Sequence, residues 1–539
     1  MKTKYTALTI GPIYLTFSKA RRLKEFWFVS FLFSTIMNRI TKQVYDLVGN
    51  KKDIILPYIE NAADFELEKV GLFPDWLIFK TGSIGFEKFK TFIDNAINET
   101  AKELIVEGKI SEKDVSTFLK EYLKTYYFEK EVVETNLILN LSPTLHLLEL
   151  QNPAYEGDQT GILYKIFKYL YKTEFYAKYY RIYTITDRHE SMEEISTREL
   201  KTILDNGQDG YTKLLRETSF KKEDEEDTNQ KVTTTEFMVE LQTLLKKKAK
   251  QQEENINNQP SLEQNNYSPK DYSFKSYHKY VAIVKADGDK IGKALTNLPD
   301  GKEPDFSKAL FLWGKESKEL INHYQGVPLY IGGDDMLFFA PVVNNGQNII
   351  QLVREINTKF ENQFKDFETR PSLSFGISLT YYKYPVFEAL ENADRLLHKV
   401  KDLGGNGISI QLLKHSGSFF DVFMGLDASN TIMNLFDELS KVSKVKSTTI
   451  SALAFHLREN EKVFESIGFD ENRIEAFFEN NIEGYSSSKY LKTAAKIVVE
   501  KFKLQKTKAL SAIYKQTLNE VYDMLRFNKF LKGFDENDR

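Results

Sequence analysis

The segment PLYIGGDDMLFFAPV, which runs from Pro328 to Val342, places two glycines and two aspartates inside an apolar run. Adjacent carboxylates are rare in buried strands, because an unpaired charge away from water is costly. The pattern predicts two strands joined by a tight turn at Gly332–Asp335. We therefore expect Asp334 and Asp335 to have a function beyond forming the turn.

Strands and helices are predicted on both sides of this hairpin. An apolar strand starts at Tyr280 and ends at Asp287 and Asp289. The other predicted elements are a helix over 305–325, a helix over 348–367, a strand over 372–382, a helix over 385–406 and a strand over 407–413. The order strand–helix–strand–strand–helix–strand is ferredoxin-like.

The N-terminal half repeats part of this order. It predicts strands over 5–17, 53–59 and 74–82, and helices over 19–40, 86–107 and 111–126. The hairpin-like motif PDWLIF parallels GGDDMLFF but lacks the glycines and the second aspartate. The fold class is therefore α+β, with two related ferredoxin-like modules of which one carries the catalytic carboxylates.

The remaining segments have a different composition. Residues 220–276 are charged and rich in Asn and Gln, which predicts a mobile linker around one short helix near 237–245. The tail from residue 421 has helical periodicity and no strong strand. The predicted domains are a first module with helical additions over 1–190, a helical insertion and linker over 191–276, a second module over 277–420 and a C-terminal helical domain over 421–539.

Composition excludes several classes of site. The 539 residues contain no cysteine, so disulfides, thiol catalysis and a cysteine-ligated zinc are excluded. The net charge is −3, which is unlike a strongly basic nucleic-acid binder. The apolar run 26–37 is shorter than the roughly 20 residues that a spanning helix needs. We expect a soluble cytoplasmic protein with no membrane partner.

Three carboxylates are predicted to converge. In a ferredoxin-like sheet the first and third strands are neighbours, so Asp287 would face Asp334 and Asp335. Three such groups repel one another unless a cation neutralises them. Oxygen ligands suit Mg²⁺ or Mn²⁺, and two such ions can activate a hydroxyl and hold a triphosphate.

Other residues near these strand ends are candidates for nucleotide binding. Gly332 and Gly333 would let a phosphate or base approach the backbone, and Gly288 and Gly292 could do the same after the first strand. Asp289 shares the face of Asp287 only if the strand continues past it. A tight hairpin with solvated carboxylates is the alternative interpretation.

A lysine is the expected triphosphate ligand. Lys401 lies near the end of the helix over 385–406, just before a Gly-Gly-Asn sequence. Lys399 and Lys383 are alternatives, and each lysine could equally be a solvated surface charge.

Four segments resemble one protein family. They are IGGDDMLFFAP, VKADGDKIGKAL, GISLTYYKYPVFEALENADRLLHKVK and the N-terminal LTIGPIYLTFSKARRLKEFWFVSFLFSTIM. In this order they resemble the large polymerase/cyclase subunit of type III CRISPR effector complexes, closest to the Cmr type. The resemblance covers residues 1–45 and about 278–412 well. GGDD alone is also similar to the motif of diguanylate cyclases.

The resemblance implies a partnership and an activity. The partners would be crRNA, target RNA and the other subunits of a Cmr-type complex. Target RNA would switch on the second Palm domain, which would join nucleotides from ATP into a messenger, usually a cyclic oligoadenylate. Asp287, Asp334 and Asp335 would hold the metal ions, and Ser30 would lie near a nucleotide in the first Palm domain.

Two features depart from many family members. The chain starts at the first Palm domain and none of its seven histidines is followed by aspartate, so we expect no HD nuclease and no DNase activity. The zinc between the Palm domains is also expected to be missing. Some members join ATP to S-adenosylmethionine, and that product stays open here. The alternatives are a catalytically silent scaffold subunit and a free-standing GGDEF-like cyclase.

Two further features remain open from the sequence. Lys489–Lys515 holds eight lysines and one acid, Glu500, which fits either contact with an RNA backbone or neighbouring subunit, or a solvated helix face. His146 lies among apolar residues and is expected to be a core histidine.

Overall fold

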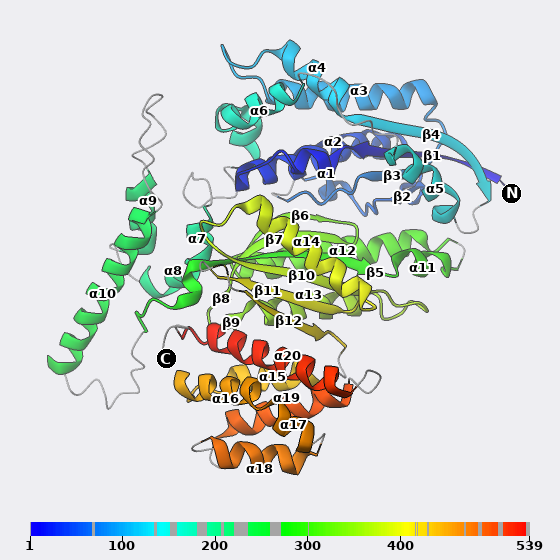
Figure 1. Ribbon diagram of the computed structural model, residues 1–539. Coiled ribbons are helices and arrows are strands. Elements are labelled where there is room, and N and C mark those ends of the chain that lie inside the picture. The colour runs from blue at the N-terminus through cyan, green and yellow to red at the C-terminus, as the bar shows by residue number, and fades with distance from the viewer. Residues whose placement is uncertain are drawn as a thin grey trace.

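Two β-sheets stacked against each other, with helices around and below them, make up the body of the protein (Figure 1). The computed structural model describes residues 2–66, 70–133, 137–150, 159–180, 191–205, 210–219, 235–258, 271–299, 301–414, 417, 419–427, 431–467, 470–482, 488–504 and 510–534. Among these residues, no helix is both long and apolar enough to cross a membrane.

The first sheet has four antiparallel strands in the order β2-β3-β1-β4. Its strands are β1 (Lys2–Gly11), β2 (Ile54–Leu56), β3 (Trp76–Lys80) and β4 (Lys124–Val133). Helices α1 (Ile13–Phe17), α2 (Leu23–Leu47), α3 (Phe86–Glu103) and α4 (Glu112–Tyr122) connect them. The strand order is that of a ferredoxin-like module, as predicted.

The second sheet has six strands in the order β12-β11-β10-β5-β7-β6. Its strands are β5 (Tyr280–Asp289), β6 (Val327–Gly332), β7 (Asp335–Pro341), β10 (Ser372–Tyr381), β11 (Gly407–Leu413) and β12 (Phe419–Gly425). A short hairpin, β8 (Val343–Asn344) with β9 (Gln347–Asn348), follows β7. The four strands β6, β7, β5 and β10 repeat the ferredoxin-like order of the first sheet, which confirms the predicted α+β class.

The helices of the second module flank this sheet, and the later helices gather at the C-terminal end (Figure 1). They are α11 (Ile291–Thr296), α12 (Glu303–His323), α13 (Ile349–Gln363), α14 (Val386–Asp402), α15 (Thr431–Lys441), α16 (Ser447–Glu459), α17 (Glu461–Ile467), α18 (Glu471–Asn481), α19 (Lys489–Leu504) and α20 (Leu510–Leu531). Between the two sheets in the chain lie α5 (Leu137–Leu150), α6 (Gln159–Tyr169), α7 (Met192–Ser196), α8 (Arg198–Leu204), α9 (Tyr211–Ser219) and α10 (Thr235–Asn258).

The second sheet is buried on both faces. Along β5, Val281 and Ile283 pack in the core that includes α2 of the first module, whereas Ala282 and Val284 pack in the core that extends to the C-terminal helices. This alternation is the period of two that a strand imposes on its side chains. The sheet therefore links the first module to the C-terminal helices through two different cores.

Three elements differ from the sequence prediction. The predicted helix over 111–126 ends at Tyr122, and the half-buried strand β4 follows it. The tail does contain a strand, β12, which pairs with β11 and runs across the predicted domain boundary at residue 420. The short helix predicted near 237–245 is the 24-residue α10, which extends away from the body beside α9 (Figure 1).

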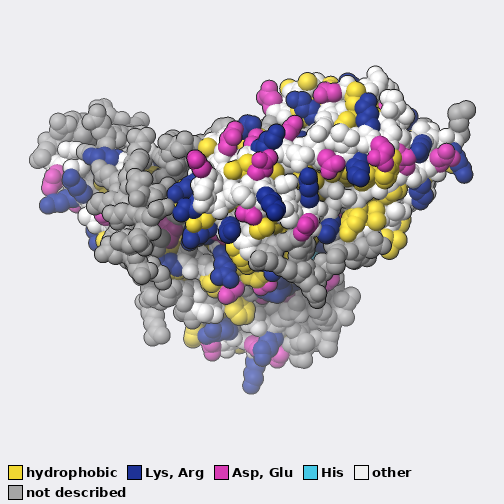
Figure 2. Space-filling model, turned by 90° about the horizontal axis from the view of Figure 1, so that it is seen from above, with side chains coloured by type: hydrophobic (Ala, Val, Ile, Leu, Met, Phe, Trp, Pro, Cys, Tyr) yellow, Lys and Arg dark blue, Asp and Glu magenta, His cyan; other side chains and the backbone are white. Residues whose placement is uncertain are grey.

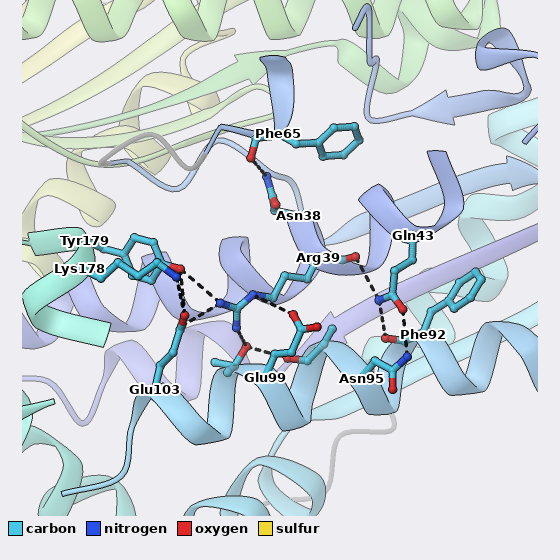
Figure 3. Close-up of polar contacts among 12 residues, drawn as sticks. Asn38, Arg39, Gln43, Phe65, Phe92, Asn95, Glu99, Glu103, Lys178 and Tyr179 are labelled. Atoms are coloured by element: carbon cyan, nitrogen blue, oxygen red, sulfur yellow. Dashed lines mark hydrogen bonds and ion pairs between the residues drawn. The ribbon is translucent and has the colours of Figure 1, made fainter. Parts of the chain in front are cut away.

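A buried polar network joins α2 to α3 (Figure 3). Arg39 donates to Thr100 Oγ1 at 2.6 Å, to Glu103 Oε2 at 2.8 Å and to the Tyr179 hydroxyl at 3.3 Å. Lys178 donates to the other oxygen of Glu103 at 2.9 Å. Each charge is paired because an isolated buried charge would be costly. The network therefore fixes the position of α2 relative to α3.

Helix α14 lies unusually close to β10 at Gly376. A Cβ at this position would lie 2.0 Å from the Ala393 carbonyl oxygen and 2.4 Å from the Leu397 nitrogen. Both atoms belong to the helix backbone, so neither can move aside without shifting the helix. Since α14 carries Lys401, this contact also sets the position of a predicted site residue.

We predict that Gly376→Ala destabilises the protein by about 2 kcal/mol or more, because overpacking against backbone forces the helix from the sheet. Chemical denaturation monitored by circular dichroism measures the change. Gly49→Ala is the control, since a Cβ there meets nothing within 4 Å. Equal stability of the two variants would contradict the proposed close packing.

Candidate active site at the β6–β7 hairpin

The β6–β7 hairpin turns on the two residues Gly333 and Asp334, and Asp335 is the first residue of β7. Gly332 pairs with Asp335 across the ladder, and Gly333 has a φ of +63°, which residues with a side chain rarely adopt. A Cβ on Gly333 would meet nothing within 4 Å, whereas one on Gly332 would lie 2.4 Å from the Tyr330 hydroxyl. Gly333 is therefore open to an approaching ligand, and the Tyr330 ring covers Gly332.

The end of β5 brings Asp287 beside this hairpin. Ala286 pairs with Met336 of β7, and on the other side Asp287 pairs with Ser374 of β10. Lys401, in the last turn of α14, forms an ion pair with Asp287 between Nζ and Oδ2. Burial lowers the pKa of Lys401 below its usual value. The predicted juxtaposition of Asp287 with the hairpin is present, and the ammonium group of Lys401 lies beside it.

The two hairpin aspartates hold their protons unusually strongly. Loss of hydration between the two sheets, together with repulsion from Asp335, raises the pKa of Asp334 to about 7. The same loss of hydration raises the pKa of Asp335 to about 6. Asp335 is exposed and Asp334 is half-buried, so solvent reaches both residues and screens part of their repulsion. The backbone N–H of Gly288 bonds to Asp334 and offsets part of its shift.

A second lysine lies behind the hairpin. Lys285 of β5 forms an ion pair with Asp394 of α14. The positive charge of Lys285 lowers the pKa of Asp335, whereas the negative charge of Asp394 raises it. Lys285 also helps to lower the pKa of Lys401 by repulsion. Two lysines and four carboxylates therefore share this corner of the sheet.

Asp289 is held by the protein itself. It is only 7% exposed and accepts hydrogen bonds from Ser372 Oγ at 2.9 Å, Ser374 Oγ at 2.7 Å and the Asn406 N–H at 2.8 Å. A Cβ on Gly405 would lie 2.6 Å from its carboxyl carbon. The structure thus places Asp289 where it joins β5 to β10 and to the turn after α14, away from the open side of the hairpin.

Gly288, near the end of β5, and Gly292, in the first turn of α11, differ in their surroundings. A Cβ on Gly288 would lie 2.6 Å from Asp334 Oδ2, so only glycine lets the strand pass this close to the hairpin. A Cβ on Gly292, at the start of α11, would meet nothing within 4 Å. Gly292 is therefore the glycine of this pair with free space beside it.

The first sheet contributes carboxylates that the sequence analysis did not single out. Asp75 lies just before β3 and raises the pKa of Asp334. Burial, followed by repulsion from Glu149 and Asp335, raises the pKa of Asp75 itself to about 7. The match of PDWLIF to GGDDMLFF could have indicated Asp75, because the two aspartates occupy the corresponding hairpin ends.

Glu149 is fixed beside Asp75 by three side chains. It accepts hydrogen bonds from Thr9 Oγ1 at 3.0 Å and from the Trp76 indole N–H, and His146 Nδ1 lies 3.3 Å from it. His146 is 63% exposed at its side chain, so the expectation of a core histidine is wrong. The cause is that α5 packs its leucines at other positions and turns His146 outward.

Ser30 lies at the junction of the two modules. It is buried in α2 and donates a hydrogen bond from Oγ to the Leu329 carbonyl of β6 at 2.7 Å. A Cβ on Gly71 would lie 2.8 Å from the same hydroxyl, and the Ile331 N–H donates to the Gly71 carbonyl at 3.1 Å. In this structure Ser30 serves the contact between the sheets, close behind the hairpin.

The two alternative lysines lie elsewhere. Lys399 is 3.6 Å from Asp421 of β12, and Lys383 lies over the Tyr382 ring. Lys401, by contrast, contacts Asp287 of the predicted carboxylate site.

The carboxylates have the ligand atoms that a metal ion needs, but they are not arranged as a metal site. Asp287, Asp334 and Asp335 supply only oxygen atoms, which Mg²⁺ and Mn²⁺ prefer. In the described part of the chain, however, no three His, Cys, Asp or Glu side chains form a group that could hold a metal ion. Asp287 is instead paired with the Lys401 ammonium group.

Known proteins share both halves of this architecture. The family model "Cas10/Cmr2, second palm domain" matches residues 280–408, and the model "CRISPR-associated protein Cmr2, N-terminal" matches residues 5–124. The Cmr2 subunit of the CRISPR system Cmr from Pyrococcus furiosus is 27% identical over 224 residues, an alignment that covers 36% of this chain and 25% of that protein. This chain thus matches about a quarter of the length of that relative.

Two solved structures share the fold across most of the chain. One is a type III-B Cmr-beta structure in the apo state, with a TM-score of 0.53, 11% identity, and coverage of 89% of this chain and 77% of that one. The other is Cmr-beta bound to cognate target RNA. It has a TM-score of 0.55 and 10% identity, and the match covers 90% of this chain and 79% of that one. Together with the family matches they support the resemblance seen in the sequence: the chain contains a segment similar to the Cmr2 N-terminal region and a segment similar to the second palm domain of Cas10/Cmr2.

Proposed function

We propose that the chain is the large subunit of a cytoplasmic, crRNA-guided type III complex of Cmr type, and that target RNA activates it to make a messenger from ATP. The observation that carries the proposal is the register of β5, which places Asp287 beside Asp334 and Asp335 inside the segment matching the second palm domain. That a structure with this fold is described with cognate target RNA supports RNA as a partner.

The proposed reaction is nucleotidyl transfer. A hydroxyl of the acceptor attacks the α-phosphorus of ATP, a new phosphorus–oxygen bond forms, the bond to the β-phosphate bridge breaks, and pyrophosphate leaves. The acceptor hydroxyl loses its proton in the same step. Asp287, Asp334 and Asp335 would hold Mg²⁺ or Mn²⁺, which supplies charge neutralisation and activates the hydroxyl when bound.

Lys401 has a specific role in this scheme. Its ammonium group pairs with Asp287 in the structure described here. When a triphosphate enters, Lys401 exchanges this carboxylate for phosphate oxygens, which releases Asp287 for its own role. Gly333 offers the open side of the hairpin for that approach. The Asp289 carboxylate stays in place and holds the turn that follows Lys401.

The acidic side of the first sheet favours one class of acceptor. Asp75 and Glu149 lie across from the hairpin, and a second triphosphate would be repelled by them. S-adenosylmethionine carries a sulfonium and an ammonium group against one carboxylate, so its net charge is about +1 and these two carboxylates repel it less than they repel a triphosphate. We therefore favour a conjugate of ATP with S-adenosylmethionine over a cyclic oligoadenylate as the product.

Two alternatives are distinguishable by simple outcomes. A silent scaffold subunit would give no ATP-derived product under any condition. A free-standing GGDEF-like cyclase would give product without RNA or partner subunits.

We predict that Asp334→Ala with Asp335→Ala abolishes the product of the reconstituted complex, because both carboxylates of the hairpin are lost. Mass spectrometry of reactions with target RNA, ATP, Mg²⁺ or Mn²⁺, and S-adenosylmethionine present or absent measures the product. Glu253→Ala with Glu254→Ala, two adjacent exposed acids of α10, is the control. Product formation by the hairpin variant at the wild-type rate would refute the catalytic assignment.

We predict that Asp75→Asn raises the KM for S-adenosylmethionine about tenfold, equivalent to about 1.4 kcal/mol, and changes the KM for ATP less than threefold. The reason is that the substitution removes one charge facing the cationic acceptor. Initial rates by chromatography at varied substrate concentrations give both values. Asp94→Asn, on the α3 surface, should change neither, and an equal rise of both constants for Asp75→Asn would argue against a cationic acceptor.

We predict that Asp334→Asn with Asp335→Asn raises the Tm of the metal-free protein at pH 8 by about 1 °C, which corresponds to about 1 kcal/mol for a chain of 539 residues. The folded pKa values of about 7 and 6 exceed the unfolded value of 3.8. The native state therefore binds more protons, and wild-type stability falls as the pH rises from about 4 to about 7. Thermal unfolding of both proteins from pH 4 to pH 8 tests this. The difference in Tm between the variant and wild type should be larger at pH 8 than at pH 4, and a smaller difference at pH 8 would contradict the prediction.

A further inference from the structure

One helix of the C-terminal domain presents a surface of lysines alone. The described residues of α19 that are exposed are Lys489, Lys492, Lys496 and Lys503. The rest of the helix is apolar or packed, with Tyr490 and its neighbours on the inner side completely buried. A spacing of three and four residues keeps the first three lysines on one face over about 10 Å.

The first three lysines differ from the fourth in their surroundings. Lys503 donates to Glu500 at 2.7 Å and lies near Glu471 of α18. In the part of the chain that the structure describes, no carboxylate lies within ion-pair distance of Lys489, Lys492 or Lys496. These three charges therefore have no counter-charge among the described residues, and they face solvent at one end of the helix.

A second group of exposed lysines lies beside this end of α19. Lys441, Lys444 and Lys446 follow the end of α15 and are exposed. The buried Asn528 of α20 joins the two places, because it accepts from the Tyr490 hydroxyl at 3.1 Å and donates to Ser440 Oγ at 2.8 Å. The start of α19 and the end of α15 thus pack on the same asparagine.

The six residues Lys441, Lys444, Lys446, Lys489, Lys492 and Lys496 form what we call the lysine surface. The two stretches that carry it, 439–446 and 488–499, contain no acidic residue. Lys532 lies beneath it, where its ammonium group donates to the Ser440 and Val442 carbonyls and lies 5.9 Å from the centre of the Tyr490 ring. These contacts fix the backbone that presents the exposed lysines.

We infer that the lysine surface binds the phosphodiester backbone of RNA without regard to its sequence. Lysine offers a point charge that suits phosphate but lacks the planar fork with which arginine reads base edges. A protein partner is less suited, because the cores of protein interfaces are depleted in lysine and enriched in aromatic side chains. On α19 the described exposed positions offer no aromatic or aliphatic side chain to such a partner.

This inference rests on the proposed function only in taking RNA as the partner, so its test uses binding and not turnover. A fluorescein-labelled 30-nucleotide single-stranded RNA is titrated with the full chain, without ATP, over a range of NaCl concentrations. Lys489→Gln with Lys492→Gln and Lys496→Gln should weaken binding about tenfold. The slope of log K against log salt should also become shallower by about 2, since each lost phosphate contact contributes about 0.7.

Two controls locate the effect. Lys246→Gln with Lys247→Gln and Lys250→Gln removes three exposed lysines of α10 and should leave affinity and slope unchanged. Lys489→Arg with Lys492→Arg and Lys496→Arg keeps the charge and should retain binding. The inference is overturned if the α19 Gln variant binds as wild type does, or if the α10 variant loses as much. The Asp334→Ala with Asp335→Ala variant should bind RNA normally, which separates this test from a failure of the proposed catalysis.

Discussion

The pairing of β5 with β7 on one side and β10 on the other is the constraint on which the site depends. The register places Ala286 opposite Met336 and Asp287 opposite Ser374, so the strand cannot slip by one residue without exchanging its two faces. Both faces are buried in different cores. The position of Asp287 beside the hairpin is thus fixed by packing far from the carboxylates themselves.

The second constraint is the repulsion among the carboxylates that the strand pairing brings together. The fold brings Asp334 and Asp335 of the hairpin close to Asp75 of the first module, and repulsion from its neighbours contributes to the raised pKa of Asp334 and of Asp75. Lys401 and Lys285 supply positive charge at the same corner. A site built in this way is least stable at neutral pH when no cation is bound, which is the condition under which it would bind metal and nucleotide most readily.

The sequence predicted the hairpin, the ferredoxin-like order and the proximity of Asp287, because these follow from strand periodicity and strand order. It did not predict the role of Asp289, since a side chain's hydrogen bonds to Ser372 and Ser374 depend on the register between β5 and β10. Strand β12 was missed because its alternating pattern, FFDVFMG, is short and lies next to helices. The match of PDWLIF to GGDDMLFF could have indicated Asp75 as a candidate, but its proximity to Asp334 and Asp335 depends on how the two sheets face each other.

The two ends of the second sheet have opposite electrostatic character. Carboxylates collect where the hairpin faces the first sheet, and lysines collect on the helices beyond β12. Phosphate groups are therefore attracted directly to the lysine surface, whereas at the hairpin they meet carboxylates and depend on Lys401 and a divalent cation. An RNA strand brings phosphates but no divalent cation in a fixed place, so the carboxylates at the hairpin would repel it. Under the proposed function and the inferred RNA contact, the lysine surface would hold RNA and the hairpin would take a metal-bound nucleotide.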